Sequence, residues 1–152
     1  MWNRKRIFSM TRRKTEIIKV TPADENHQVV SFKWSSGRVH SHRRKPCEDC
    51  PWRRDAVGEF PAEAFRISAH TAYDLAEETF ACHSSGAEKP ATCAGFLLKG
   101  ADHNLAIRMA YLGGRLTADF EDGGHALFES YREMAIANGV DPDDSVLKPC
   151  RD

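Results

Sequence analysis

The chain has 152 residues, of which 41% are hydrophobic, and this suits one ordinary domain with a core rather than a disordered chain. No run approaches the ~18 consecutive apolar residues of a membrane span, and the basic N-terminus lacks the ~7–15 apolar residues of a secretion signal. We therefore expect a cytoplasmic protein without a membrane partner.

The formal net charge is zero, but the charges are unevenly distributed along the chain. Residues 1–46 hold 12 Lys and Arg against 3 Asp and Glu, whereas residues 47–152 hold 10 against 19. The sign changes where a Cys-x-x-Cys motif begins. We therefore divide the chain into a basic flexible tail (1–14), a β-hairpin with a basic connector (15–45) and a helical domain that binds a metal through cysteines (46–152).

Two β-rich segments, 15–20 and 28–34, predict a small hairpin. In the second segment Val30, Phe32 and Trp34 alternate with polar residues, which is the period of a half-buried strand. The residues between the two segments are polar and typical of a turn.

The first predicted helix runs from Pro61 to about Phe80. Proline suits the first position of a helix, and apolar residues recur at three- and four-residue spacing from Phe65 onward. They form one stripe that a core can cover.

Two further helices are predicted downstream. One has Asp102 as its N-cap and runs to Leu112, where Gly113-Gly114 ends it. The other runs from about Gly124 through Ala135 and ends at Asn138-Gly139. The predicted fold is α+β, with a small N-terminal β-hairpin and about three helices organised around a four-cysteine metal site.

The five cysteines carry the strongest functional signal. The count is odd and no export signal is visible, so a framework of disulfides is disfavoured and metal ligands or reactive thiols are favoured. Cys47 and Cys50 form a Cys-x-x-Cys turn, which places two thiolates within reach of one metal. Cys82 and Cys93 lie at the ends of predicted elements and supply a second pair. Cys150 is expected to be a free thiol.

The expected metal is zinc, with an iron–sulfur cluster as the alternative. Both take thiolate ligands, and zinc is preferred because it is the commoner structural ion. His40, His42 or His83 would replace a thiol in a Cys3His site, although each is expected to be an ordinary solvated or core histidine. Four buried cysteines that act only as small apolar residues, or reactive redox thiols, are the competing interpretations.

Two sharper enzymatic interpretations fail on the sequence. The residues from Pro46 to Cys50 match half of the zinc-deaminase signature, but none of the upstream histidines is followed by the required glutamate. A thioredoxin-like site needs a βαβ setting, which the predicted elements do not offer. The sequence assigns no catalytic residue and no organic cofactor.

Basic clusters in the N-terminal third are candidates for phosphate contacts. A nucleic-acid or protein partner would bind this segment, and the alternative is a solvated basic segment that balances the acidic body of the protein. The candidate residues are Arg12, Arg13, Lys14, Arg43, Arg44 and Lys45.

The cysteine region resembles a family of short, uncharacterised four-cysteine proteins from actinobacteria and their phages. The resemblance covers about residues 46–151. The segments that carry it are 47–55 (CEDCPWRRD), 58–61 (GEFP), 80–83 (FACH), 93–97 (CAGFL) and 131–135 (YREMA). The resemblance implies a common domain built around the cysteines and a phage or mobile-element origin, and it implies no activity.

These features predict a metal-binding module that engages nucleic acid or a protein and acts in regulation, rather than an enzyme. The first alternative is an iron–sulfur or thiol-based redox enzyme or sensor. Its candidate polar groups, for which capping and surface hydrogen bonds are the simpler role, are Arg53, Asp55, His83, His103 and Asn104. The second alternative is an inhibitor that mimics nucleic acid through the acidic residues Glu77, Glu78, Asp119, Glu121 and Asp122.

Overall fold

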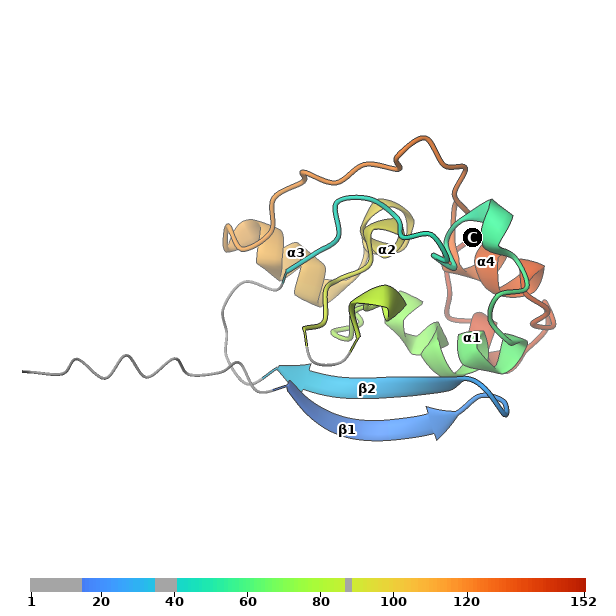
Figure 1. Ribbon diagram of the computed structural model, residues 1–152. Coiled ribbons are helices and arrows are strands. Elements are labelled where there is room, and N and C mark those ends of the chain that lie inside the picture. Colours follow the sequence, from blue (N-terminus) through green and yellow to red (C-terminus); the bar gives the residue numbers. More distant parts are fainter. Residues whose placement is uncertain (1–14, 35–40, 87–88) are drawn as a thin grey trace, which may run out of the picture.

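The computed structural model describes residues 15–34, 41–86 and 89–152, and the predicted basic tail lies outside these ranges. The fold is α+β, with one two-stranded antiparallel sheet and four α-helices among the described residues. The elements are β1 (Thr15–Pro22), β2 (Gln28–Trp34), α1 (Ala62–Ser68), α2 (Ala94–Lys99), α3 (Leu105–Leu112) and α4 (Tyr131–Ala137). Figure 1 shows the hairpin along one side of the helices, with α1 next to it.

The hairpin is confirmed. Ile17 of β1 pairs with Phe32 of β2, so these apolar side chains share one face of the sheet. Ile18 is the extra residue of a β-bulge, because the register shifts between Ile17 and Lys19. The turn is closed by Asp24, whose carboxylate accepts a hydrogen bond from the backbone N–H of His27 at 2.6 Å.

The first predicted helix is too long. α1 ends at Ser68, and one turn of 3-10 helix carries the chain only to Ala72. Leu75 then has φ 61°, and its N–H donates to the carbonyl of His103 at 3.1 Å. The prediction failed because the backbone beyond Ala72 pairs with the segment before α3 instead of continuing the helix.

One helix was not predicted, and one predicted N-cap was wrong. α2 has only six residues, four of which are buried, so it lacks the amphipathic period that reveals a helix in a sequence. In α3 the N-cap is Asn104 rather than Asp102, and its side chain accepts from the N–H of Ile107 at 3.1 Å. The end of α3 at Gly113 agrees with the prediction.

The last helix begins later than predicted but ends as predicted. Ser130 caps α4 by accepting from the N–H of Glu133 at 3.1 Å, and an irregular segment occupies the residues before it. Gly139 has φ 98°, and Val140 folds back so that its N–H bonds to the carbonyl of Ala135 at 3.0 Å. This is the left-handed stop that the Asn-Gly pair indicated.

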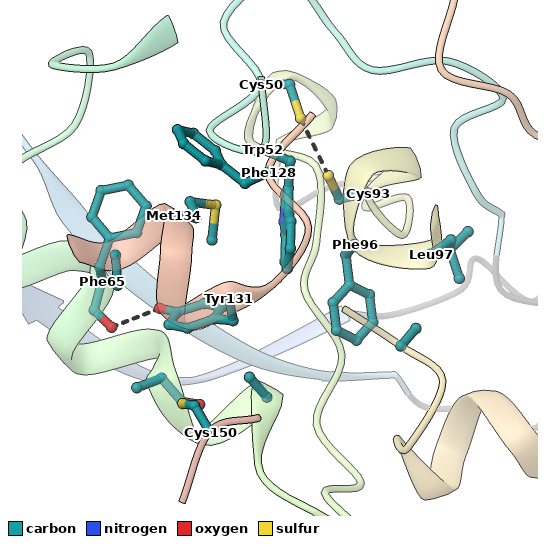
Figure 2. Packing of buried hydrophobic residues seen from close by; sticks show 14 of the residues in the cluster. Cys50, Trp52, Phe65, Cys93, Phe96, Leu97, Phe128, Tyr131, Met134 and Cys150 are labelled. Atoms are coloured by element: carbon teal, nitrogen blue, oxygen red, sulfur yellow. Dashed lines mark hydrogen bonds between the residues drawn. The ribbon is translucent and has the colours of Figure 1, made fainter. Parts of the chain in front are cut away.

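The core is centred on Trp52, which is fully buried. Its ring meets those of Phe80, Phe96 and Tyr131 at centroid distances of 6.2, 6.4 and 6.0 Å, mostly edge to face. The hydroxyl of Tyr131 donates to the carbonyl of Phe65 at 2.6 Å and so ties α4 to α1 (Figure 2). The Cys-x-x-Cys turn enters the core immediately before this tryptophan.

Candidate metal centre

Three short extended segments position the second pair of cysteines. The N–H of Cys82 donates to the carbonyl of Ala91 at 2.7 Å, and the N–H of Cys93 donates to that of Phe80 at 2.9 Å. These bonds form a small antiparallel ladder that brings the two cysteines together across the intervening loop. A third segment joins it where the N–H of Arg43 donates to the carbonyl of Thr92 at 2.9 Å.

The first pair is held by a tight turn. The N–H of Cys50 donates to the carbonyl of Cys47 at 3.2 Å, as expected when two residues separate the cysteines. The guanidinium of Arg53 donates to the same carbonyl at 3.2 Å. Arg53 is in turn fixed by two bonds to the carboxylate of Asp55, at 2.6 and 2.8 Å. Arg53 therefore supports the turn, and Asp55 holds Arg53 in place.

The four thiols form one cluster, which we call the sulfur row. Electrostatic interactions link Cys82 to Cys47, Cys47 to Cys50, and Cys50 to Cys93. The sulfur atoms of Cys50 and Cys93 are 3.6 Å apart, as Figure 2 shows beside Trp52. All four cysteines are free and buried, so residues more than 30 positions apart meet inside the core.

The surroundings raise the pKa values of three thiols in the sulfur row. The thiol contact with Cys50, and then burial, raise the pKa of Cys47. The contact with Cys47 lowers the pKa of Cys50, but the contact with Cys93 and burial outweigh it and raise it to about 12. The contact with Cys47 and burial raise the pKa of Cys82 strongly. Without an ion, these thiols are protonated at neutral pH.

The sulfur row is not yet arranged as a coordination shell. Within the described ranges, no group of three or more His, Cys, Asp or Glu side chains is arranged to hold a metal ion. The donors have the right chemistry, because four thiolates are a common zinc or iron ligand set. The sulfur atoms of Cys50 and Cys93 already lie 3.6 Å apart, although they come from different segments of the chain.

The histidines have different surroundings. The Nδ1 atom of His83 lies 3.8 Å from the sulfur of Cys47, so this exposed ring borders the sulfur row. His42 instead bonds to Asp119, with Nε2 2.5 Å from the carboxylate oxygen. His40 lies outside the described residues. Of the candidate histidines that the structure describes, His83 borders the cysteines and His42 bonds elsewhere.

Cys150 is separate from the sulfur row. Its sulfur lies 3.9 Å from the carbonyl oxygen of Ala69 and 3.8 Å from that of Val146. Burial raises its pKa to about 11. It is a free thiol, as predicted, but it is buried against the turn that follows α1.

The other polar candidates near the cysteines have structural roles. The ring of His103 bonds through Nε2 to the carbonyl of Ala72 at 2.6 Å. The amide of Asn104 donates to the carbonyl of Glu78 at 2.7 Å while its oxygen caps α3. These bonds fix the chain after α1 against the start of α3.

Part of the basic connector is paired with the acidic body. Arg44 forms an ion pair with Asp119 at 3.3 Å, and Lys45 forms one with Glu121 at 3.0 Å. The carbonyl of Arg44 also accepts from the N–H of Glu121 at 2.8 Å. The side chain of Arg43 is exposed, and the predicted contacts at 12–14 lie outside the described residues.

The features that the sequence did not reveal are the ladder around Cys82 and Cys93 and the support from Arg53. The ladder joins two three-residue segments, which are too short to show a strand period. Their signal is indirect, since each segment ends in a cysteine and a Ser-Ser-Gly turn lies between them.

A model of a family of unknown function (DUF6283) matches residues 42–151, which include all five cysteines. The chain belongs to this family. The match confirms the resemblance to an uncharacterised family, and the hairpin lies before the DUF6283 region. No curated protein and no solved structure matches the chain.

Among the residues with described structure, no helix is long and apolar enough to cross a membrane.

Proposed function

We propose that the DUF6283 domain of this chain binds a single zinc ion through Cys47, Cys50, Cys82 and Cys93. The observation that carries the proposal is the separation of 3.6 Å between the sulfur atoms of Cys50 and Cys93. A tetrahedral site with Zn–S bonds of about 2.3 Å has sulfur atoms about 3.8 Å apart. The spacing is therefore close to that of two ligands on one ion.

The sulfur row favours a single ion over an iron–sulfur cluster. In a cluster the four thiolates are distributed over two or more irons, with sulfide ions between them. Such a cluster needs space between the thiolates that bind different irons. Here the sulfur atoms of Cys50 and Cys93 are only 3.6 Å apart, although the two residues come from different segments.

The ion would act as a cross-link. Cys47 and Cys50 belong to the turn that enters the core before Trp52, whereas Cys93 is the N-cap of α2. One ion on all four thiolates would lock these segments together, and its binding energy would add to the folding energy. In this proposal the metal stabilises a binding or regulatory module and supplies no reaction.

Metal analysis of the full chain purified without oxygen tests this proposal. We expect one zinc per chain and no visible absorbance. Cys50→Ser and Cys93→Ser should lose the zinc, whereas Cys150→Ser, which changes a cysteine outside the sulfur row, should keep it. A brown protein that contains iron and sulfide would show that the four cysteines bind an iron–sulfur cluster instead of zinc. A protein without bound metal would overturn the proposal.

Binding of nucleic acid through the basic N-terminal segment stays a prediction. The ion pairs of Arg44 and Lys45 already neutralise part of the connector. If phosphates are bound, affinity for DNA or RNA should fall steeply as salt rises, and it should fall again when residues 1–14 are deleted. An affinity that changes neither with salt nor with the deletion would exclude this role.

An origin in actinobacteria or their phages also stays a prediction.

A further inference from the structure

The outer edge of β1 is open to a further strand. Among the described residues the sheet has two strands, and Figure 1 shows β1 on the side of the hairpin away from the helices. No described residue outside the hairpin forms a backbone hydrogen bond with residues 16–21. Ile17, Ile18 and Val20 are large apolar residues, yet they are 55, 65 and 45% exposed. An edge strand with these properties can pair with another strand.

The β-bulge places Glu16 and Lys19 on the same face of the sheet. Glu16 lies opposite Lys33 of β2, whereas Lys19 lies opposite Ser31. Lys33 and Ser31 are two positions apart on a regular strand, so they point to one face, and their partners do the same. Without the bulge, residues 16 and 19 would point to opposite faces. Neither of them belongs to an ion pair within the described ranges.

These two charges make the edge of β1 complementary to itself. When two copies of a strand pair antiparallel about a two-fold axis, the axis is perpendicular to the sheet and opposing residues share a face. Glu16 and Lys19 meet this condition, so Glu16 of one copy can lie opposite Lys19 of the other. The symmetry repeats the pair at the other end, and Ile17 then lies opposite Ile18 of the second copy. Two opposite-charge pairs therefore flank four isoleucines.

We propose that the chain forms a dimer in which β1 pairs antiparallel with β1 of a second copy in this register. A lysine on an edge strand opposes pairing when it meets no opposite charge, but here each Lys19 meets Glu16. The pairing joins two marginal two-stranded sheets into one of four strands. The bulge twists the edge and confines the pairing to this short segment, so the dimer dissociates on dilution. The interface lies before the DUF6283 region and does not depend on zinc.

Sedimentation equilibrium of the full chain, with a reductant that is not a thiol, tests this proposal. We expect a reversible equilibrium between monomer and dimer. Lys19→Glu puts like charges opposite each other at both ends of the interface and should weaken dimerisation by about tenfold or more. Within its own hairpin this residue faces Ser31, so the fold meets no new repulsion. Lys148→Glu, the same change at an exposed lysine outside the hairpin, should leave the equilibrium unchanged.

A second variant carries the opposite change at the edge. Glu16→Lys together with Lys33→Glu reverses the charge of residue 16 but keeps opposite charges across the hairpin. Alone it should also dimerise weakly, because two lysines would meet at each end of the interface. Mixed with the Lys19→Glu chain, it should form a one-to-one heterodimer with an affinity near that of the wild type, since unlike charges meet again.

Each contrary result would overturn the proposal. A wild type that stays monomeric at every concentration would exclude the dimer. A Lys19→Glu chain that dimerises like the wild type would place the interface on another surface. If Lys148→Glu weakens the dimer as much as Lys19→Glu does, association responds to the net charge and not to this edge. A mixture of the two edge variants that remains monomeric would exclude the register. None of these results bears on zinc binding.

Discussion

A Cβ atom on Gly100 would lie 2.4 Å from the Cη2 atom of Trp52, which is well inside van der Waals contact. A Cβ atom on Gly95 would lie 2.5 Å from the Cβ atom of the same tryptophan. α2 therefore rests directly on the indole ring at both of its ends. Cys93 is the N-cap residue of α2 and Cys50 precedes Trp52 by two residues, so this contact lies next to the pair of sulfur atoms that are 3.6 Å apart.

Gly100→Ala and Gly95→Ala should destabilise the protein by about 1–3 kcal/mol each, since the added methyl group overpacks the core. Denaturant unfolding measures the change. Gly113→Ala is the matched control, because its nearest neighbours lie at 3.3 Å and one of them is the flexible side chain of Arg115. Equal stabilities for all three variants would show that α2 does not rest on the tryptophan as described.

The N-cap of α4 gives a second prediction. Ser130→Ala removes the hydroxyl that accepts from the N–H of Glu133, and we expect a loss of about 1 kcal/mol. Ser145→Ala, at an exposed serine, should change the free energy of unfolding little. Urea unfolding of the two variants compares them directly. If the Ser130 variant is as stable as the control, the side chain of Ser130 does not stabilise α4 as its N-cap.

Asp144 gives a prediction about pH. Its carboxylate accepts from the N–H of Val146 and pairs with Arg66, and these contacts lower its pKa from the ordinary 3.8. A lowered folded-state pKa adds stability above pH 3.8, and that stability is lost as the pH falls through the folded-state value. Asp144→Asn keeps an oxygen for Val146 but loses the charge.

We therefore expect Asp144→Asn to be less stable than the wild type at neutral pH, with a difference that vanishes in acid. Urea unfolding at a series of pH values measures this. A difference that is constant with pH would show that the charge of Asp144 does not contribute.

Local patterns predicted the parts of the fold that depend on local interactions. The alternation around Phe32 predicted β2, and the Asn-Gly pair before Val140 predicted the end of α4. The cap of α4 also has a local signature, because Glu133 follows Ser130 by three residues. These features need only near neighbours along the chain.

The elements that were missed depend on contacts between distant segments. α2 is buried on nearly all sides, so its sequence has no polar face to mark a helix. The chain after Ala72 leaves the helix because Leu75 bonds to His103, 28 residues away. The proximity of Cys50 and Cys93 was expected from their shared ability to bind a metal. The ladder around Cys82 and Cys93 was not expected, because its segments are too short to show the alternation of a strand.

Zinc should raise the stability of the wild type and of Cys150→Ser by equal amounts. A ligand that binds only the folded state adds about 2.7 kcal/mol at a hundred times its Kd. Thermal unfolding of metal-free protein, with and without added zinc, measures this. Cys93→Ser should gain much less, because it lacks one of the four ligands. An equal gain in Cys93→Ser would place the ion elsewhere.

X-ray absorption spectroscopy at the zinc edge, on the full chain purified without oxygen, tests the central claim most directly. It reports the identity, number and distance of the atoms bound to the metal. The sulfur row predicts four sulfur ligands at about 2.3 Å and no nitrogen or oxygen ligand. A shell that contains nitrogen or oxygen, or a protein without zinc to measure, would contradict it.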